Sequence, residues 1–193
     1  MTALASGTSL PLLASQRRRW TWRRPEPDDP KDNCGAFFRF TGGLDRDALK
    51  TAVDRAYAET EALRVVFEEH DGDVRQVIPL PGPAPWSSLE LSGDDAAFDH
   101  MNRSLGVPFG LLGGSPLCSH TLIETPGSTW LFFCNDHIIV DAYGAHRYLL
   151  RIAQHYNAIV GGTPAPPRGF APLARLQSPW TPIAQGGCTS HAG

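Results

Sequence analysis

The hydrophobic pattern of the chain alternates between strand-like and helix-like segments from residue 34 to residue 160. Apolar positions recur every three or four residues in three stretches, which predicts helices near 46–59, 95–105 and 144–160. Short apolar runs bounded by turn residues predict strands; they are residues 34–40, 63–68, 74–79, 117–124 and 129–135. This alternation is typical of an α/β domain, here a two-layer lobe with helices packed on one mixed sheet.

One stretch combines a buried strand with polar groups at its end. Residues 130–134 are five consecutive apolar residues, which favours a strand covered on both faces. His137 and Asp141 follow it, four residues apart, and a helical pattern begins soon afterwards. Strand, polar turn and helix together often hold a catalytic side chain at the edge of a core. A single His in such a place is nevertheless more often structural, so both interpretations stay open.

The composition is that of a globular protein of one domain with a tail. Of the 193 residues, 41% are hydrophobic and 19% are charged, which allows a sizeable core. A net charge of -3 calls for neither a nucleic-acid nor an anionic-membrane partner. Acidic residues follow the basic cluster closely, so we expect a solvated helix face there; the cluster is Arg17, Arg18, Arg19, Arg23 and Arg24.

Targeting and metal signals are weak in this sequence. No apolar run approaches the roughly 18 residues that span a bilayer. Four cysteines lack the spacing of a metal site, which favours a reducing cytoplasm and no metal or cofactor of the protein's own; they are Cys34, Cys118, Cys134 and Cys188. We expect a disordered N-terminus at 1–9, a folded lobe at 10–176 and a linker or unstructured tail at 177–193.

Six short motifs follow one another between residues 10 and 176. They are Leu12…Gln16…Trp20, Gly43-Leu44-Asp45…Leu49, Leu63-Arg64-Val65-Val66-Phe67, Pro108-Phe109-Gly110-Leu111, Ser115-Pro116-Leu117 and Asp136-His137-Ile138-Ile139-Val140-Asp141-Ala142. In order and spacing the sequence resembles the condensation domains of nonribosomal peptide synthetases, within the chloramphenicol-acetyltransferase-like superfamily. The matching family motifs include "LRxxF", "PFDL", "GPL" and the signature "HHxxxDG".

Three positions depart from the family motifs. Asp136 stands at the first His of the signature, Ala142 stands at its Gly, and Gly110 replaces the Asp of "PFDL". Family members also carry a second lobe of similar size, and the active site lies in a channel between the lobes. The resemblance therefore implies an N-terminal half-domain with one wall of that channel.

The resemblance also implies roles for individual residues. His137 is the signature His, near the attacking amine, which it deprotonates or positions; a neutral imidazole suits either task. Asp141 and Arg64 are expected to form a buried ion pair behind the turn. Asp136 either favours a protonated His137 or points away from the channel. Ala142, Tyr143 and Gly144 are expected to line the channel.

Three functions follow as hypotheses. The first is a condensation-type acyltransferase lobe that forms amide bonds between acyl and aminoacyl thioesters, carried by phosphopantetheine on peptidyl or aminoacyl carrier proteins. The second is a non-catalytic module that binds a carrier protein or a separate second lobe, or self-associates. The third is a small-molecule acyl-CoA acetyltransferase. The intact set of His137, Asp141 and Arg64 favours the first hypothesis, while Asp136, Ala142 and the single lobe favour the second.

Overall fold

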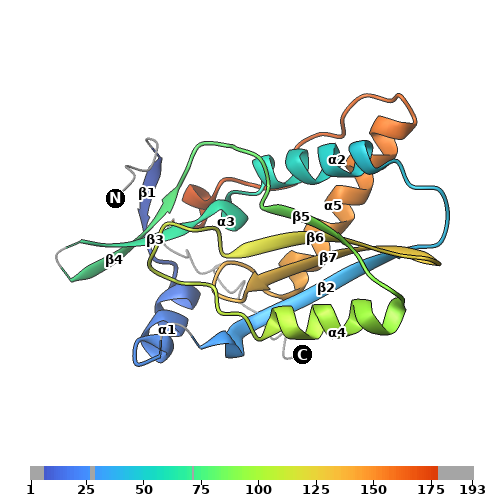
Figure 1. Cartoon of the computed structure of the whole chain (residues 1–193). Helices are drawn as coiled ribbons and strands as arrows, with labels where there is room; N and C mark the ends of the chain where they lie inside the picture. The colour runs from blue at the N-terminus through green and yellow to red at the C-terminus, as the bar shows by residue number, and fades with distance from the viewer. Residues whose placement is uncertain (1–6, 27–28, 71, 178–193) are drawn as a thin grey trace, which may run out of the picture.

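The computed structural model describes residues 7–26, 29–70 and 72–177, which form two sheets and five α-helices (Figure 1). The strands are β1 Thr8–Pro11, β2 Asn33–Phe40, β3 Val66–His70, β4 Asp73–Ile78, β5 Trp86–Glu90, β6 Cys118–Thr125 and β7 Ser128–Asp136. The α-helices are α1 Ala14–Arg23, α2 Arg46–Glu59, α3 Glu61–Arg64, α4 Asp94–Leu105 and α5 Ala142–Val160. Two 3-10 helices, η1 Pro30–Asp32 and η2 Leu173–Gln177, complete the described part.

The larger sheet has four strands in the order β2-β7-β6-β5. Only β5 and β6 run parallel, while β7 pairs antiparallel with both β2 and β6. Strand β7 therefore lies inside the sheet, as its continuous apolar run predicts. The α/β class with helices on a mixed sheet is confirmed.

Helices cover both faces of this sheet. Leu131 and Phe133 of β7 belong to the core that α2 and α5 close, whereas Trp130 and Phe132 pack in a second cluster with Met101 of α4. The alternation follows from the strand geometry, because successive side chains point to opposite faces. Figure 1 shows α2 and α5 on one side of the strands and α4 on the other. Helix α4 thus adds a layer that the expected two-layer lobe did not include.

The predicted helices are confirmed with small shifts of their ends. Helix α2 spans the predicted 46–59, and the Asp45 side chain caps it by accepting a hydrogen bond from the Ala48 amide at 2.9 Å. Helix α4 begins at Asp94. Helix α5 begins at Ala142, two residues before the predicted start, because the Asp141 side chain caps it.

Three expectations about the strands are wrong. A separate three-stranded sheet, β1-β4-β3, replaces the single sheet. Leu63 and Arg64 belong to α3, so the first strand of the predicted hairpin starts only at Val66. Strand β1 begins at Thr8, inside the segment expected to be disordered, and pairs with β4.

Of the tail expected at 177–193, only Gln177 is described, as the last residue of η2; residues 178–193 lie outside the described part.

The segment after α5 is fixed to the body of the lobe by side chains. Arg151 donates to the carbonyl oxygens of Pro166 and Pro167, at 3.1 and 2.5 Å. The Leu173 amide donates to a carboxylate oxygen of Glu61 at 2.7 Å. These contacts place η2 beside α3.

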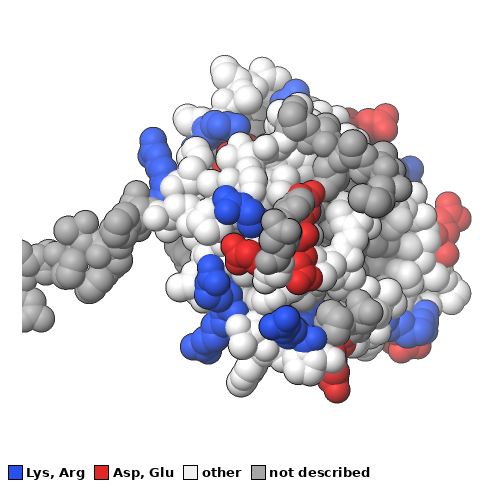
Figure 2. Space-filling model, turned by 90° about the vertical axis from the view of Figure 1, so that its left-hand side faces the viewer, with Lys and Arg blue, Asp and Glu red and all other residues white. Residues whose placement is uncertain are grey.

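Charges on the face that carries α1, β1 and β4 are of both signs. Figure 2 shows basic and acidic side chains interspersed there. Lys31, for example, lies 2.8 Å from an oxygen of Asp29 and 3.8 Å from one of Glu26. Within the described ranges, no helix is both long and apolar enough to cross a membrane.

Candidate active site at the end of strand β7

The turn between β7 and α5 is held by hydrogen bonds along its length. The His137 amide donates to the Asp32 carbonyl oxygen at 2.9 Å, and the Ile139 amide donates to the Asp136 carbonyl oxygen at 3.2 Å. The buried Asn135 side chain donates to the carbonyl oxygens of Asp136 and Val140, at 3.0 and 3.4 Å. The backbone around His137 is therefore closely defined on both sides.

His137 lines a groove on the surface of the lobe. The residue is partly buried, and its Nδ1 atom is shielded from solvent without a hydrogen-bond partner among the described residues. The groove has a volume of about 390 Å³; its other walls are Leu13 just before α1, Ser15, Gln16 and Arg19 of α1, Ala62 of α3, the turn residues 138–141, and Leu173 and Leu176 of η2.

Asp136 points away from the groove and is fully buried. The Asp136 Oδ2 atom pairs with Nη1 of Arg23, whose side chain is 1% exposed. The Asp136 Oδ1 atom accepts a hydrogen bond from the Ile138 amide at 2.9 Å. Of the two interpretations of Asp136, the structure agrees with a side chain that points away from the channel.

The expected ion pair between Arg64 and Asp141 does not form. Arg64 is buried and donates to the Pro79 carbonyl oxygen, while Asp141 is exposed and accepts from the Gly144 amide at 2.7 Å. The difference has two causes: Arg64 lies on α3 and not on a strand, and the N-terminus of α5 already engages the Asp141 carboxylate. Burial lowers the pKa of Arg64.

The residues expected to line the channel lie in the first turn of α5. Ala142 is exposed and lies in α5, where the helical backbone has negative φ. This position therefore does not require the glycine of the family signature. It lines a different cavity of about 300 Å³ beside β2, with Cys34 and His146. Tyr143 is 70% exposed. Gly144 approaches Val140 so closely that a Cβ atom there would lie 2.4 Å from Val140 Cγ2, which explains the glycine.

Sequence reasoning missed Arg23 as a buried residue. The basic cluster was expected to be solvated, and for Arg23 this is wrong. A signal existed in the helical spacing, because Gln16, Trp20 and Arg23 follow one another at intervals of four and three residues and so share one face of α1. Its partner Asp136, however, lies 113 residues away in sequence.

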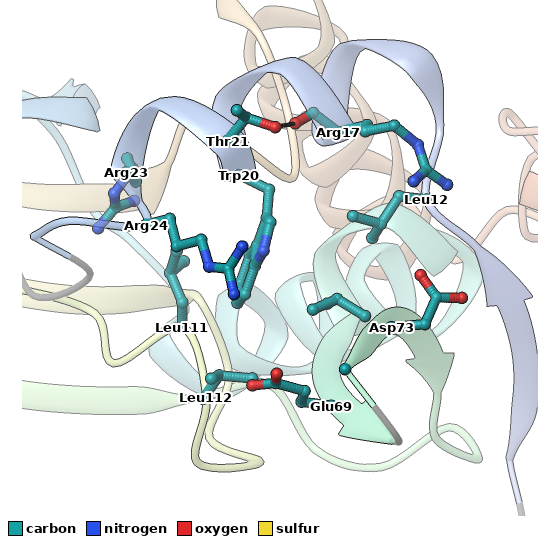
Figure 3. A pocket seen from close by; sticks show the side chains of 12 residues that line it. Leu12, Arg17, Trp20, Thr21, Arg23, Arg24, Glu69, Asp73, Leu111 and Leu112 are labelled. Atoms are coloured by element: carbon teal, nitrogen blue, oxygen red, sulfur yellow. Dashed lines mark hydrogen bonds between the residues drawn. The ribbon is translucent and has the colours of Figure 1, made fainter.

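A further cavity of about 300 Å³ lies on another side of α1 (Figure 3). Trp20 and Leu111 contribute apolar walls, and Arg24 extends over the opening beside Trp20. None of the site residues expected from the sequence lines it. Among the described residues, no group of three or more His, Cys, Asp and Glu side chains is placed to hold a metal ion.

A family model for the Condensation domain matches residues 7–172. The chain belongs to the condensation domain family. The resemblance drawn from the six motifs is thereby confirmed, and the matched span begins three residues before the expected lobe at 10–176.

Curated relatives are much longer than this chain. It is 28% identical over 173 residues to an isonitrile lipopeptide synthase of Streptomyces coeruleorubidus, covering 86% of this chain and 12% of that protein. It is 27% identical over 170 residues to a dimodular nonribosomal peptide synthase of Bacillus subtilis, covering 86% of this chain and 7% of that protein.

Solved structures share the fold. The starter condensation domain of the rhizomide synthetase matches with a TM-score of 0.79 and 25% identity, over 88% of this chain and 42% of that one. The first condensation domain of the CDA synthetase matches with a TM-score of 0.79 and 23% identity, over 88% and 45%. The chain thus spans less than half the length of each of these two solved condensation domains.

Proposed function

We propose that this chain is the N-terminal lobe of a condensation-type acyltransferase that forms amide bonds in nonribosomal peptide synthesis. The observation that carries the proposal is the position of His137, which lines a groove while hydrogen bonds fix the backbone on both sides of it. Family membership supports the same chemistry. A second lobe would close the groove into a channel.

The reaction uses His137 on the attacking amine. The amine nitrogen of an aminoacyl thioester attacks the carbonyl carbon of an acyl thioester, so that a C–N bond forms and the C–S bond breaks. A neutral imidazole accepts a hydrogen bond from that amine, which orients its lone pair and takes up the charge that develops on nitrogen. The proton leaves the amine, and the sulfur departs as a thiol.

The substrates are thioesters on the phosphopantetheine arms of peptidyl or aminoacyl carrier proteins. The apolar walls of the groove, Leu13, Ala62, Leu173 and Leu176, suit the uncharged parts of such an arm and its acyl group. One solved relative, a variant of the rhizomide starter domain, is in complex with C8-CoA and Leu-SNAC. These two thioesters are suitable test substrates, because they replace both carrier proteins.

The test joins the chain by a flexible linker to the C-terminal lobe of the rhizomide starter domain. Amide formed from C8-CoA and Leu-SNAC is measured by mass spectrometry against the C-terminal lobe alone. We expect product with the parent and its loss, by about a hundredfold or more, with His137→Ala. His146→Ala is the matched control, because His146 is an exposed residue of α5 that does not line the groove. A folded fusion without product would contradict the proposal and favour the non-catalytic binding module.

A further inference from the structure

We propose that Arg23 of α1 is a positioning residue for His137 and acts through Asp136. The inference rests on the proposed function of His137 but concerns a different contact. It assigns a role to the Asp that stands where the family signature has its first His. Asp136 carries a charge at this position, and Arg23 neutralises it.

The pair is built into the interior. Asp136 is 0% exposed and Arg23 is 1% exposed, and the Arg23 Nη1 atom pairs with Asp136 Oδ2. Two charges removed from water are tolerated only when they compensate one another. A carboxylate at residue 136 therefore requires the cation of α1.

The same carboxylate fixes the backbone on the far side of His137. Its Oδ1 atom accepts from the Ile138 amide at 2.9 Å. Residue 137 is thus enclosed between the residue that bears the carboxylate and the residue whose amide the carboxylate binds. Rotation of the Asp136 side chain would break this bond, so the Arg23 contact, by holding the side chain in place, also holds the turn.

Arg23 reaches a second support of the turn. Its Nη2 atom donates to the Asp29 carbonyl oxygen at 3.0 Å, and its Nε atom lies 4.0 Å from Oδ2 of Asp32. The carbonyl oxygen of Asp32 in turn accepts from the His137 amide. The Arg23 guanidinium therefore links α1 to the 29–32 segment and to Asp136, and through Asp136 it is linked to the Ile138 amide. Its planar fork of donors allows several such contacts at once.

The neighbouring arginine provides a matched control. Arg24 follows Arg23 directly but is exposed, and Figure 3 shows it turned over the cavity beside Trp20 while Arg23 points elsewhere. Arg24 does not line the His137 groove. Arg24→Met removes the same charge from the same end of α1 without touching Asp136.

The experiment compares Arg23→Met, Asp136→Asn, the double variant and Arg24→Met. Asn at 136 keeps an acceptor for the Ile138 amide, and the double variant leaves no unpaired charge. The first readout is the NMR signal of the His137 ring in the full chain, assigned with His137→Gln. The second is kcat and KM for amide formation in the fused two-lobe protein.

We expect Arg23→Met to shift the His137 signal and to lower kcat about tenfold or more with little change in KM, because misplacing a reacting group affects the chemical step. The double variant should return both readouts toward the parent, and Arg24→Met should leave them unchanged. If Arg23→Met does not fold, Asp136→Asn is compared with the parent and with Arg24→Met instead, because it also breaks the charge pair. An unmoved His137 signal in a folded single variant would overturn the inference. A shifted signal in a protein that forms no amide would uphold the positioning and refute the proposed function.

Discussion

The signature residues have different partners from those that the family pattern implies. Asp141 serves as the N-cap of α5, and the buried ion pair near the turn is Arg23 with Asp136. The turn itself could be predicted, because it follows from a strand, a polar segment and a helix that are contiguous in sequence. The partner of Asp136 could not, because it depends on how α1 packs against β7.

This assignment changes the expected effect of mutations at Asp141. Asp141→Asn should leave the free energy of unfolding nearly unchanged, because Asn caps helices as well as Asp does. Asp141→Ala should lower it by about 1 kcal/mol. Chemical denaturation measures both. A loss of several kcal/mol in Asp141→Asn would restore the expected buried pair with Arg64.

The buried side chain of His120 couples the stability of the fold to pH. His120 is fully buried between the Pro85 carbonyl oxygen, 2.9 Å from Nδ1, and the Tyr148 hydroxyl, 2.8 Å from Nε2. Since a carbonyl only accepts, Nδ1 carries the proton and Nε2 accepts from Tyr148. Burial lowers the pKa of His120 to about 4. No sequence pattern indicated this network, because its three residues come from separate segments.

The unfolded chain therefore binds a proton at His120 at a higher pH than the folded chain does. Between about pH 6.5 and pH 4 the unfolded state is protonated and the folded state is not, so the free energy of unfolding falls as the pH is lowered, by on the order of 3 kcal/mol. Urea titrations across this range should show the slope. His120→Phe should flatten it, and the exposed His146→Gln should not. An unchanged slope in His120→Phe would contradict the assignment.

Among the elements, length and periodicity decide what could be predicted. Helices α2, α4 and α5 carry long apolar stripes and were predicted within two residues of their ends. Strands β1 and β5 have four and five residues, and α3 has four, so none of them holds enough residues for a period to show. Their structure depends on pairing with distant segments.

An ion pair between α2 and α5 lies where the segment that leads to η2 is attached. Arg151 of α5 makes a two-point ion pair with Glu59 of α2, and both side chains are largely buried. Arg151→Met should lower the free energy of unfolding by about 3 kcal/mol or more, because it leaves the Glu59 carboxylate without its main partner. Thermal and urea unfolding measure this. Arg147→Met, at an exposed position one turn earlier, is the control, and an equal effect of the two changes would contradict the role of the pair.

At the scale of the whole molecule, the groove has an exposed apolar residue at its edge. Leu176 of η2 is 63% exposed on one side of the groove. From the family resemblance we expect an uncovered apolar or polar-lined face around His137, since a partner lobe would cover it, while the division of the strands into two sheets could not be read from the pattern.

We expect the isolated chain to self-associate through this face. Light scattering over a range of protein concentrations should show an average mass above that of one chain. Leu176→Asp should reduce the association, whereas Val160→Asp, at a comparably exposed position in the last turn of α5, should not. A strictly monomeric parent would contradict this expectation.

The central claim is that, of the two adjacent signature residues, His137 serves the chemistry and Asp136 serves the structure. The direct test is the free energy of unfolding of His137→Ala and Asp136→Ala, measured side by side. His137→Ala should cost less than about 1 kcal/mol, because its ring Nδ1 makes no hydrogen bond within the described chain. Asp136→Ala should cost about 3 kcal/mol or more, because it leaves Arg23 buried without its carboxylate partner and removes the acceptor of the Ile138 amide. Equal losses, or a larger loss in His137→Ala, would contradict the account.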